Sequence, residues 1–111
     1  MRLMLLDEAE LEMTLAAEHY ELQCPGLGEE FLAAISNNLD LLLANRYIGQ
    51  SFTVDGLVSV HEYVIKRFPY YIVYKVSTNC LTVISIAHQH RRQGHWYNRV
   101  HESPAIYRLT A

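Results

Sequence analysis

The chain has 111 residues, of which 50% are hydrophobic and 19% are charged, so it is long enough for one modest core and too apolar for a disordered chain. The formal net charge of −3 excludes an overall basic character. The charges are unevenly distributed, because residues 1–62 carry eleven acids and two bases, whereas residues 63–111 carry seven bases and one acid. Such a chain can present a basic face despite its acidic total.

One domain is expected over residues 1–111, with a mobile tail at residues 103–111. Cys24 and Cys80 are isolated, and the chain shows neither a signal peptide nor an apolar run of membrane-spanning length. The expected location is therefore the cytoplasm, with reduced thiols and no membrane partner.

The first predicted elements are a strand and a helix. Arg2–Leu6 is a short apolar run that predicts a strand. Asp7 is predicted to be the N-cap of the following helix, because Glu10 completes a capping-box pattern. Apolar residues recur at helical spacing until Cys24, where Pro25 and a glycine end the pattern.

A second helix is predicted from Gly28 to Asn45 or Gly49. The short connection at residues 25–28 predicts an antiparallel helix hairpin. The apolar stripe of this helix consists of Phe31, Ile35, Leu39 and Leu42.

The apolar period then changes from 3.6 to 2. Ser51–Gly56 is predicted to be a loop, and the alternation over Val58–Arg67 predicts a strand that Pro69 interrupts. Tyr70–Val76 and Cys80–Ala87 predict two further strands of a meander. The order β-α-α-β-β-β predicts an α+β fold, with an N-terminal strand and an antiparallel helix hairpin packed on a mainly antiparallel sheet.

The stretch after the last predicted strand reads as a polar loop. Gln89–Asn98 contains a glycine and several charges, and Trp96 is expected to pack back on the body. Tyr97–His101 is predicted to form a short helical turn.

Four bases lie at the ends of predicted strands, where neighbouring strands could bring them together. Guanidinium groups suit phosphate because they donate two parallel hydrogen bonds and stay charged, so the cluster predicts a phosphate or RNA site. The alternative is a set of surface charges that form salt bridges between strands. The four residues are Lys66, Arg67, Arg91 and Arg92.

Four of the six histidines fall within a window of 14 residues: His88, His90, His95 and His101. Histidine is the natural general acid and base near neutral pH, and Glu62 and Tyr97 are further candidates for proton transfer in RNA cleavage. The alternatives are a zinc site, since His-x-His is a ligand pair, and simple hydrogen bonding within the sheet. No carboxylate or cysteine nearby completes such a metal site, so neither a metal nor a cofactor is expected.

The chain resembles the RelE/ParE superfamily of toxins from type II toxin–antitoxin systems, also called plasmid stabilisation proteins. The resemblance covers residues 3–99 and rests on the order and spacing of four blocks, none of which is diagnostic alone. These are Asp7-Glu8-Ala9-Glu10-Leu11-Glu12 with His19-Tyr20; Pro25-Gly26-Leu27-Gly28-Glu29-Glu30-Phe31-Leu32; Asn45 with Ile48-Gly49; and Lys66-Arg67-Phe68-Pro69-Tyr70-Tyr71-Ile72-Val73-Tyr74 with Ala87-His88, Arg91-Arg92 and Trp96.

The resemblance implies a growth inhibitor that a cognate antitoxin holds inactive. RelE-like members cleave mRNA on the ribosome without a metal, which is the first hypothesis, and ParE-like members poison DNA gyrase without chemistry. An inactive relative that only binds antitoxin is the third hypothesis. For the first hypothesis, the catalytic candidates are His88, His90, Arg91, Tyr97 and Glu62, and the phosphate-binding or RNA-binding candidates are Lys66, Arg67, Arg92 and Arg99.

Overall fold

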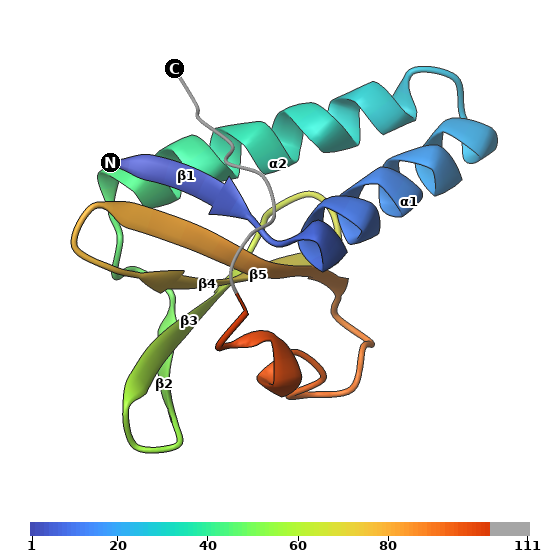
Figure 1. Cartoon of the computed structure of the whole chain (residues 1–111). Coiled ribbons are helices and arrows are strands. Elements are labelled where there is room, and N and C mark those ends of the chain that lie inside the picture. Colours follow the sequence, from blue (N-terminus) through green and yellow to red (C-terminus); the bar gives the residue numbers. More distant parts are fainter. Residues whose placement is uncertain (103–111) are drawn as a thin grey trace.

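A computed structural model describes residues 1–102, and the predicted mobile tail at residues 103–111 lies outside the described residues. Figure 1 shows two helices above a strongly twisted sheet and a short 3-10 helix on the opposite side. The elements are β1 (Arg2–Leu5), α1 (Asp7–Gln23), α2 (Leu27–Ala44), β2 (Gln50–Val54), β3 (Val58–Val64), β4 (Tyr70–Val76), β5 (Cys80–His88) and η1 (Tyr97–Arg99).

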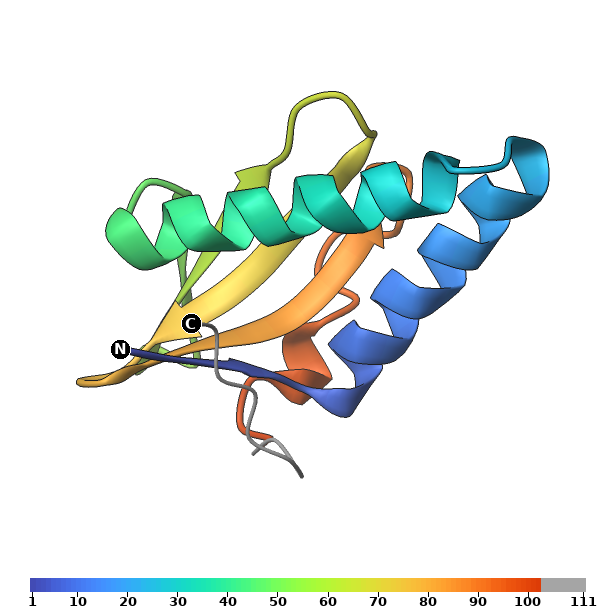
Figure 2. The same ribbon diagram turned by 90° about the horizontal axis from the view of Figure 1, so that it is seen from above.

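The five strands form one sheet in the order β1-β5-β4-β3-β2. β1 runs parallel to β5, and the other neighbours are antiparallel. Both helices lie over the same face of the sheet, as the view from above shows (Figure 2). The predicted α+β architecture is therefore confirmed. No helix within residues 1–102 has the length and apolar character needed to cross a membrane.

The start of α1 differs from the prediction. Leu6, not Asp7, is the N-cap residue, and no side chain caps this end of the helix. Asp7, Glu8 and Glu10 instead occupy the first turn, where their carboxylates favour the positive end of the helix dipole. The predicted end is confirmed, since α1 stops at Gln23 before Pro25.

The turn between the two helices is fixed by a carboxylate and a glycine. The Glu21 carboxylate accepts hydrogen bonds from the backbone N–H of Gly26 at 3.0 and 3.1 Å and of Gly28 at 3.1 Å. These N–H groups belong to the first turn of α2, which has no partner for them within the helix. A side chain at Gly28 would lie 2.6 Å from the carbonyl oxygen of Ala17, so only glycine allows the helices to approach this closely.

The predicted loop at Ser51–Gly56 is wrong, because Gln50–Val54 forms strand β2 on the outer side of β3. Asp55 and Gly56 have φ angles of +54° and +71°, and the Leu57 N–H donates to the Val54 carbonyl at 3.1 Å. Two central residues with positive φ define the tight turn that matches the twist of a β-hairpin.

The predicted strand Val58–Arg67 is shorter than expected and ends at Val64. The chain then turns, with the Ile65 N–H donating to the Tyr70 carbonyl at 3.1 Å. Arg67 has a φ of +78°, which no continuing strand permits.

The sheet separates two hydrophobic cores. The larger one lies between the helices and the sheet, and the smaller one lies between the sheet and residues 89–101. There Trp96 packs back on the body, as predicted, and is fully buried. Burial of these apolar side chains is the main stabilising term of the fold. The smaller core consists of Leu6, Val60, Tyr71, Val73, Ile84, Ala87, Trp96 and Val100.

Candidate functional site

A dense polar cluster among residues 1–102 is centred on Glu12 of α1. Its Oε1 atom accepts hydrogen bonds from Ser85 Oγ at 2.9 Å, from the Ile86 backbone N–H at 3.1 Å and from Arg99 Nη1 at 3.0 Å. Its Oε2 atom accepts a longer one from Arg91 Nη1 at 3.4 Å. The Glu12 side chain is only 15% exposed, so this charge is held by partners rather than by water.

The sheet topology explains why a carboxylate is needed at this place. β1 ends at Leu5, which pairs with Val83, so no strand of the described part of the chain borders the remainder of β5 on that edge. The Ile86 N–H on this free edge donates to Glu12, and the Ile84 carbonyl accepts from Arg99 Nη1 at 3.2 Å. Two side chains thereby replace the hydrogen bonds of a missing strand, since buried backbone groups without partners are costly.

A β-bulge orients Ser85 toward this cluster. Val73 pairs with Ser85 whereas the next residue, Tyr74, pairs with Val83, so the strand β5 contains one extra residue here. A bulge of this kind breaks the alternation of side chains and redirects one of them. Ser85 is fully buried and contacts both Glu12 on α1 and His95. His95 belongs to residues 89–102, the covering segment, which packs on the face of the sheet opposite the helices.

His95 joins this cluster to the covering segment. Because Ser85 Oγ donates to Glu12, it accepts from His95 Nε2 at 3.0 Å. The other ring nitrogen, Nδ1, lies 3.4 Å from Tyr71 Oη and 3.1 Å from the Arg92 carbonyl. In the neutral ring Nδ1 accepts from the tyrosine, and in the protonated ring it donates to the carbonyl.

The electrostatics of the cluster keep His95 neutral. Burial lowers the pKa of His95 below its usual value of 6.5, and the neighbouring Arg91 and Arg99 act in the same direction, against the Arg92 carbonyl and Glu12. Burial likewise raises the pKa of Tyr71, with Glu62 acting in the same direction. Neither ring is therefore charged near neutral pH.

The lowered pKa of His95 predicts that stability falls in mild acid. The unfolded chain takes up a proton near pH 6.5, whereas the folded protein does so only at a lower pH, so stability is lost as the pH falls below 6.5. Urea unfolding at pH 7.5 and pH 5.5 measures this loss. The loss should be smaller in His95→Gln, which has no titrating ring, and an equal loss in both proteins would contradict the assignment.

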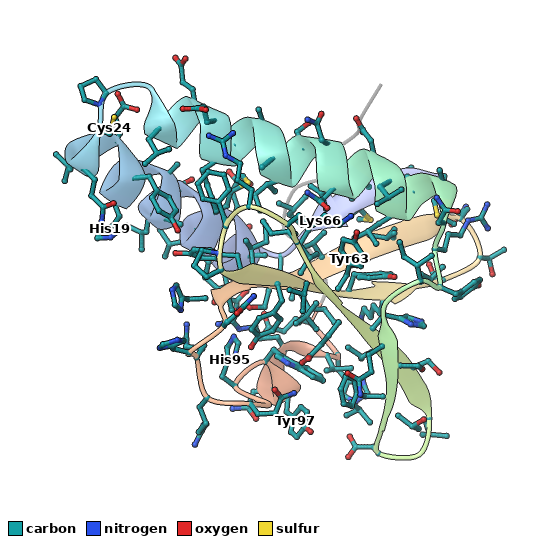
Figure 3. All side chains as sticks on the ribbon, turned by 180° about the vertical axis from the view of Figure 1, so that it is seen from behind. His19, Cys24, Tyr63, Lys66, His95 and Tyr97 are labelled. Carbon is teal, nitrogen blue, oxygen red and sulfur yellow. The ribbon has the colours of Figure 1, made fainter. Side chains whose placement is uncertain are left out.

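The basic side chains that were predicted to form one phosphate site do not share one environment in the structure. Arg67 Nη2 pairs with Glu30 Oε1 on α2 at 2.5 Å, and Lys66 and Arg92 are exposed. Figure 3 shows Lys66 on the side of the helices and His95 on the opposite side of the sheet. Arg99, predicted to bind RNA, pairs with Glu12 and is 14% exposed on its side chain.

Two of the predicted catalytic residues do line one groove. A groove of about 290 Å³ lies between α1 and the ends of β4 and β5, and its lining includes His19, Tyr70, His88 and Arg91. The His88 ring packs edge-on against Tyr70, with 5.3 Å between the ring centroids. Glu12 also lines this groove, so the charge of Arg91 there is compensated.

The other three catalytic candidates lie elsewhere or are already bonded. His90 is exposed next to the His88 ring, and its backbone N–H donates to His88 Nδ1 at 3.1 Å. Glu62 Oε2 accepts hydrogen bonds from Trp96 Nε1 and from Gln93, both at 3.0 Å, which is a structural contact. Tyr97 is 53% exposed and stacks edge-on against Trp96.

The sequence assigned no site role to Glu12 or Ser85, and His95 was only a member of the histidine window. Glu12 appeared to be one of several acids near the start of a helix, and Ser85 a small polar residue within an apolar strand. The contacts of Glu12 with its partners join residues 73 to 87 positions apart, which no local pattern records. Within residues 1–102, no three or more His, Cys, Asp or Glu side chains are placed to hold a metal ion.

The fold is that of a small toxin of the RelE/ParE type. A solved structure described as a chromosomal ParDE TA system from P. aeruginosa superposes with a TM-score of 0.67, covering 79% of this chain and 95% of that chain at 20% identity. The family model of the ParE toxin of type II toxin–antitoxin systems, parDE, matches residues 3–93. No curated protein sequence matches significantly. The chain therefore belongs to the ParE toxin family.

Proposed function

We propose that this toxin inhibits growth by binding DNA gyrase, as ParE-like toxins do, and that it cleaves no RNA. The observation that carries the proposal is the Glu12 cluster. Its carboxylate lies 3.0 Å from Arg99 and 3.4 Å from Arg91, two of the cations that a phosphate site would require. RNA cleavage depends on cations free to stabilise the charge that develops on the phosphate. Here Glu12 already compensates them.

The free-energy cost of separating Arg99 from Glu12 also argues against RNA cleavage. Arg99 and Glu12 are both largely buried, and separating a buried pair leaves an uncompensated charge on each side. Arg99 also donates to the Ile84 carbonyl, so its guanidinium group is held by the sheet edge. Its position fits a structural role better than a catalytic one.

Inhibition by binding, in contrast, needs only a stable exposed surface. The exposed side chains of α1 include Leu11, Leu15 and Leu22, which are 58%, 54% and 89% exposed. They recur along one helix, as expected of a surface that contacts a protein. The cognate antitoxin, which membership of a toxin–antitoxin family implies, is the other partner that such a surface would serve.

Ribosome-dependent mRNA cleavage is the second candidate, and the groove beside β5 favours it. Tyr70 could stack on a base while His88 moves a proton and Arg91 contacts the phosphate. This hypothesis requires His88, whereas the gyrase hypothesis does not.

His88→Ala is therefore expected to stay toxic. Growth inhibition in cells should match that of the unchanged toxin, because a half-buried ring at the end of β5 contributes little to a binding surface spread over helices. Purified protein should inhibit gyrase supercoiling, and the 5′ ends of mRNA from a cell-free translation reaction should remain unchanged. His101→Ala is the matched control, since the His101 side chain is exposed beside Asp55 and does not line the groove.

Three results would contradict the proposal. Loss of toxicity in His88→Ala, with His101→Ala still toxic and both variants folded, would assign the groove to catalysis. New mRNA ends that appear only on translated message would establish the nuclease. If the protein neither inhibits gyrase nor cleaves mRNA, it would be an inactive relative that only binds antitoxin.

A further inference from the structure

The outer edge of β2 is an open edge of the sheet. β2 is the last strand in the order β1-β5-β4-β3-β2, and it pairs only with β3. Within residues 1–102, no strand covers its other edge. Figure 1 shows β2 and β3 as a hairpin that extends away from the helices, so this edge is not shielded by α1 or α2.

The sequence of β2 contains none of the features that usually prevent an edge from pairing. Its five residues, Gln50–Val54, include no charge and no proline, and its pairing with β3 runs without a bulge. Natural edge strands are commonly protected by such residues, because unpaired N–H and C=O groups accept another strand. An unprotected edge of this length indicates a pairing surface.

We propose that β2 pairs antiparallel with β2 of a second copy of this chain, about a twofold axis through Phe52. In this register Phe52 faces Phe52 of the other copy, and Ser51 faces Thr53. An aromatic pair and two pairs of hydroxyl-bearing side chains are favourable neighbours across antiparallel strands. The strand is therefore compatible with itself, as a twofold interface requires.

The residues next to β2 raise no conflict in the same arrangement. In this register Asp55, which follows the strand, faces Gly49 of the other copy, so no like charges meet at either end of the paired strands.

The helices are poor candidates for contact between copies. Neither α1 nor α2 contains a lysine or arginine, whereas together they carry nine acids. Two copies facing each other through this layer would bring like charges together. The uncharged edge of β2 has no such conflict, which is why a second copy is assigned to β2.

Two double variants at the same positions test the proposal. Ser51→Lys with Thr53→Lys places lysine opposite lysine twice across the axis, and self-association should weaken roughly tenfold or more. Ser51→Glu with Thr53→Lys places glutamate opposite lysine twice, and self-association should match or exceed that of the unchanged protein. Both residues are exposed in the single chain, so each variant should fold, which circular dichroism checks.

Sedimentation equilibrium over a range of protein concentrations measures the association of the three proteins. A monomeric unchanged protein would overturn the proposal, as would two variants that associate equally. The inference does not depend on the target of the toxin. A monomeric protein that still inhibits gyrase would remove only the pairing of β2, and a dimer without gyrase inhibition would leave that pairing intact.

Discussion

Trp96→Ala is expected to lower the free energy of unfolding by about 4 kcal/mol, the usual cost of deleting a large buried aromatic side chain. Trp96 is fully buried at the centre of the smaller core, and its ring contacts Phe52 and Tyr97. Its Nε1–H donates to Glu62 Oε2, so the substitution also removes a hydrogen bond to a charged group. Urea unfolding followed by circular dichroism measures the change.

Two controls separate the contributions of Trp96. Trp96→Phe keeps most of the ring and loses the donor to Glu62, so its loss should be smaller than that of alanine. Tyr97→Ala changes an aromatic neighbour that is 53% exposed, and the expected cost is below about 1 kcal/mol. Equal losses in the free energy of unfolding for Trp96→Ala and Tyr97→Ala would show that Trp96 does not anchor the covering segment.

The effect of Trp96 matters because the covering segment holds several parts of the candidate site. Residues 89–102 carry Arg91, His95 and Arg99, which all reach Glu12 on α1. Small domains are stabilised by only about 5–15 kcal/mol in total. A loss of the size expected for Trp96→Ala would therefore take a large share of that stability.

The periodic elements of the fold were predictable because their signals are local. The stripe of α2, the proline and glycine after α1, and the apolar runs of β4 and β5 are each visible within about ten residues. β2 was missed because its five residues alternate weakly, although the Asp55-Gly56 pair after it is a strong hairpin signal. This turn pair predicts a strand on each side of it, even though residues 50–54 are largely polar.

The candidate site was less predictable, because its geometry is made by contacts between distant residues. Clustering in the sequence suggested that Lys66, Arg67, Arg91 and Arg92 form one site. The structure instead pairs Arg67 with Glu30 and Arg91 with Glu12. Charge patterns indicate which residues are available, but the carboxylate that each base meets depends on the packing of helices on the sheet.

Glu12→Ala should be the most destabilising substitution of a charged residue within residues 1–102, with an expected loss of about 3–4 kcal/mol. It removes the acceptor for Ser85, for the Ile86 backbone N–H and for Arg99 at once. Arg99 would be left as a largely buried charge without a carboxylate, and the free edge of β5 would lose a hydrogen-bond partner. Urea unfolding at pH 7.5 measures this loss.

Glu12→Gln and Glu18→Ala complete the experiment. Glutamine keeps an acceptor oxygen for Ser85 and Ile86 but loses the charge that holds Arg99, so its loss should lie between those of the unchanged protein and the alanine variant. Glu18 lies on the same helix and is exposed, so its replacement should change stability by less than about 0.5 kcal/mol. Similar small losses at both glutamates would mean that Glu12 does not hold the sheet edge. In that case Arg91 and Arg99 would be free for a phosphate, which would revive RNA cleavage as the function of this surface.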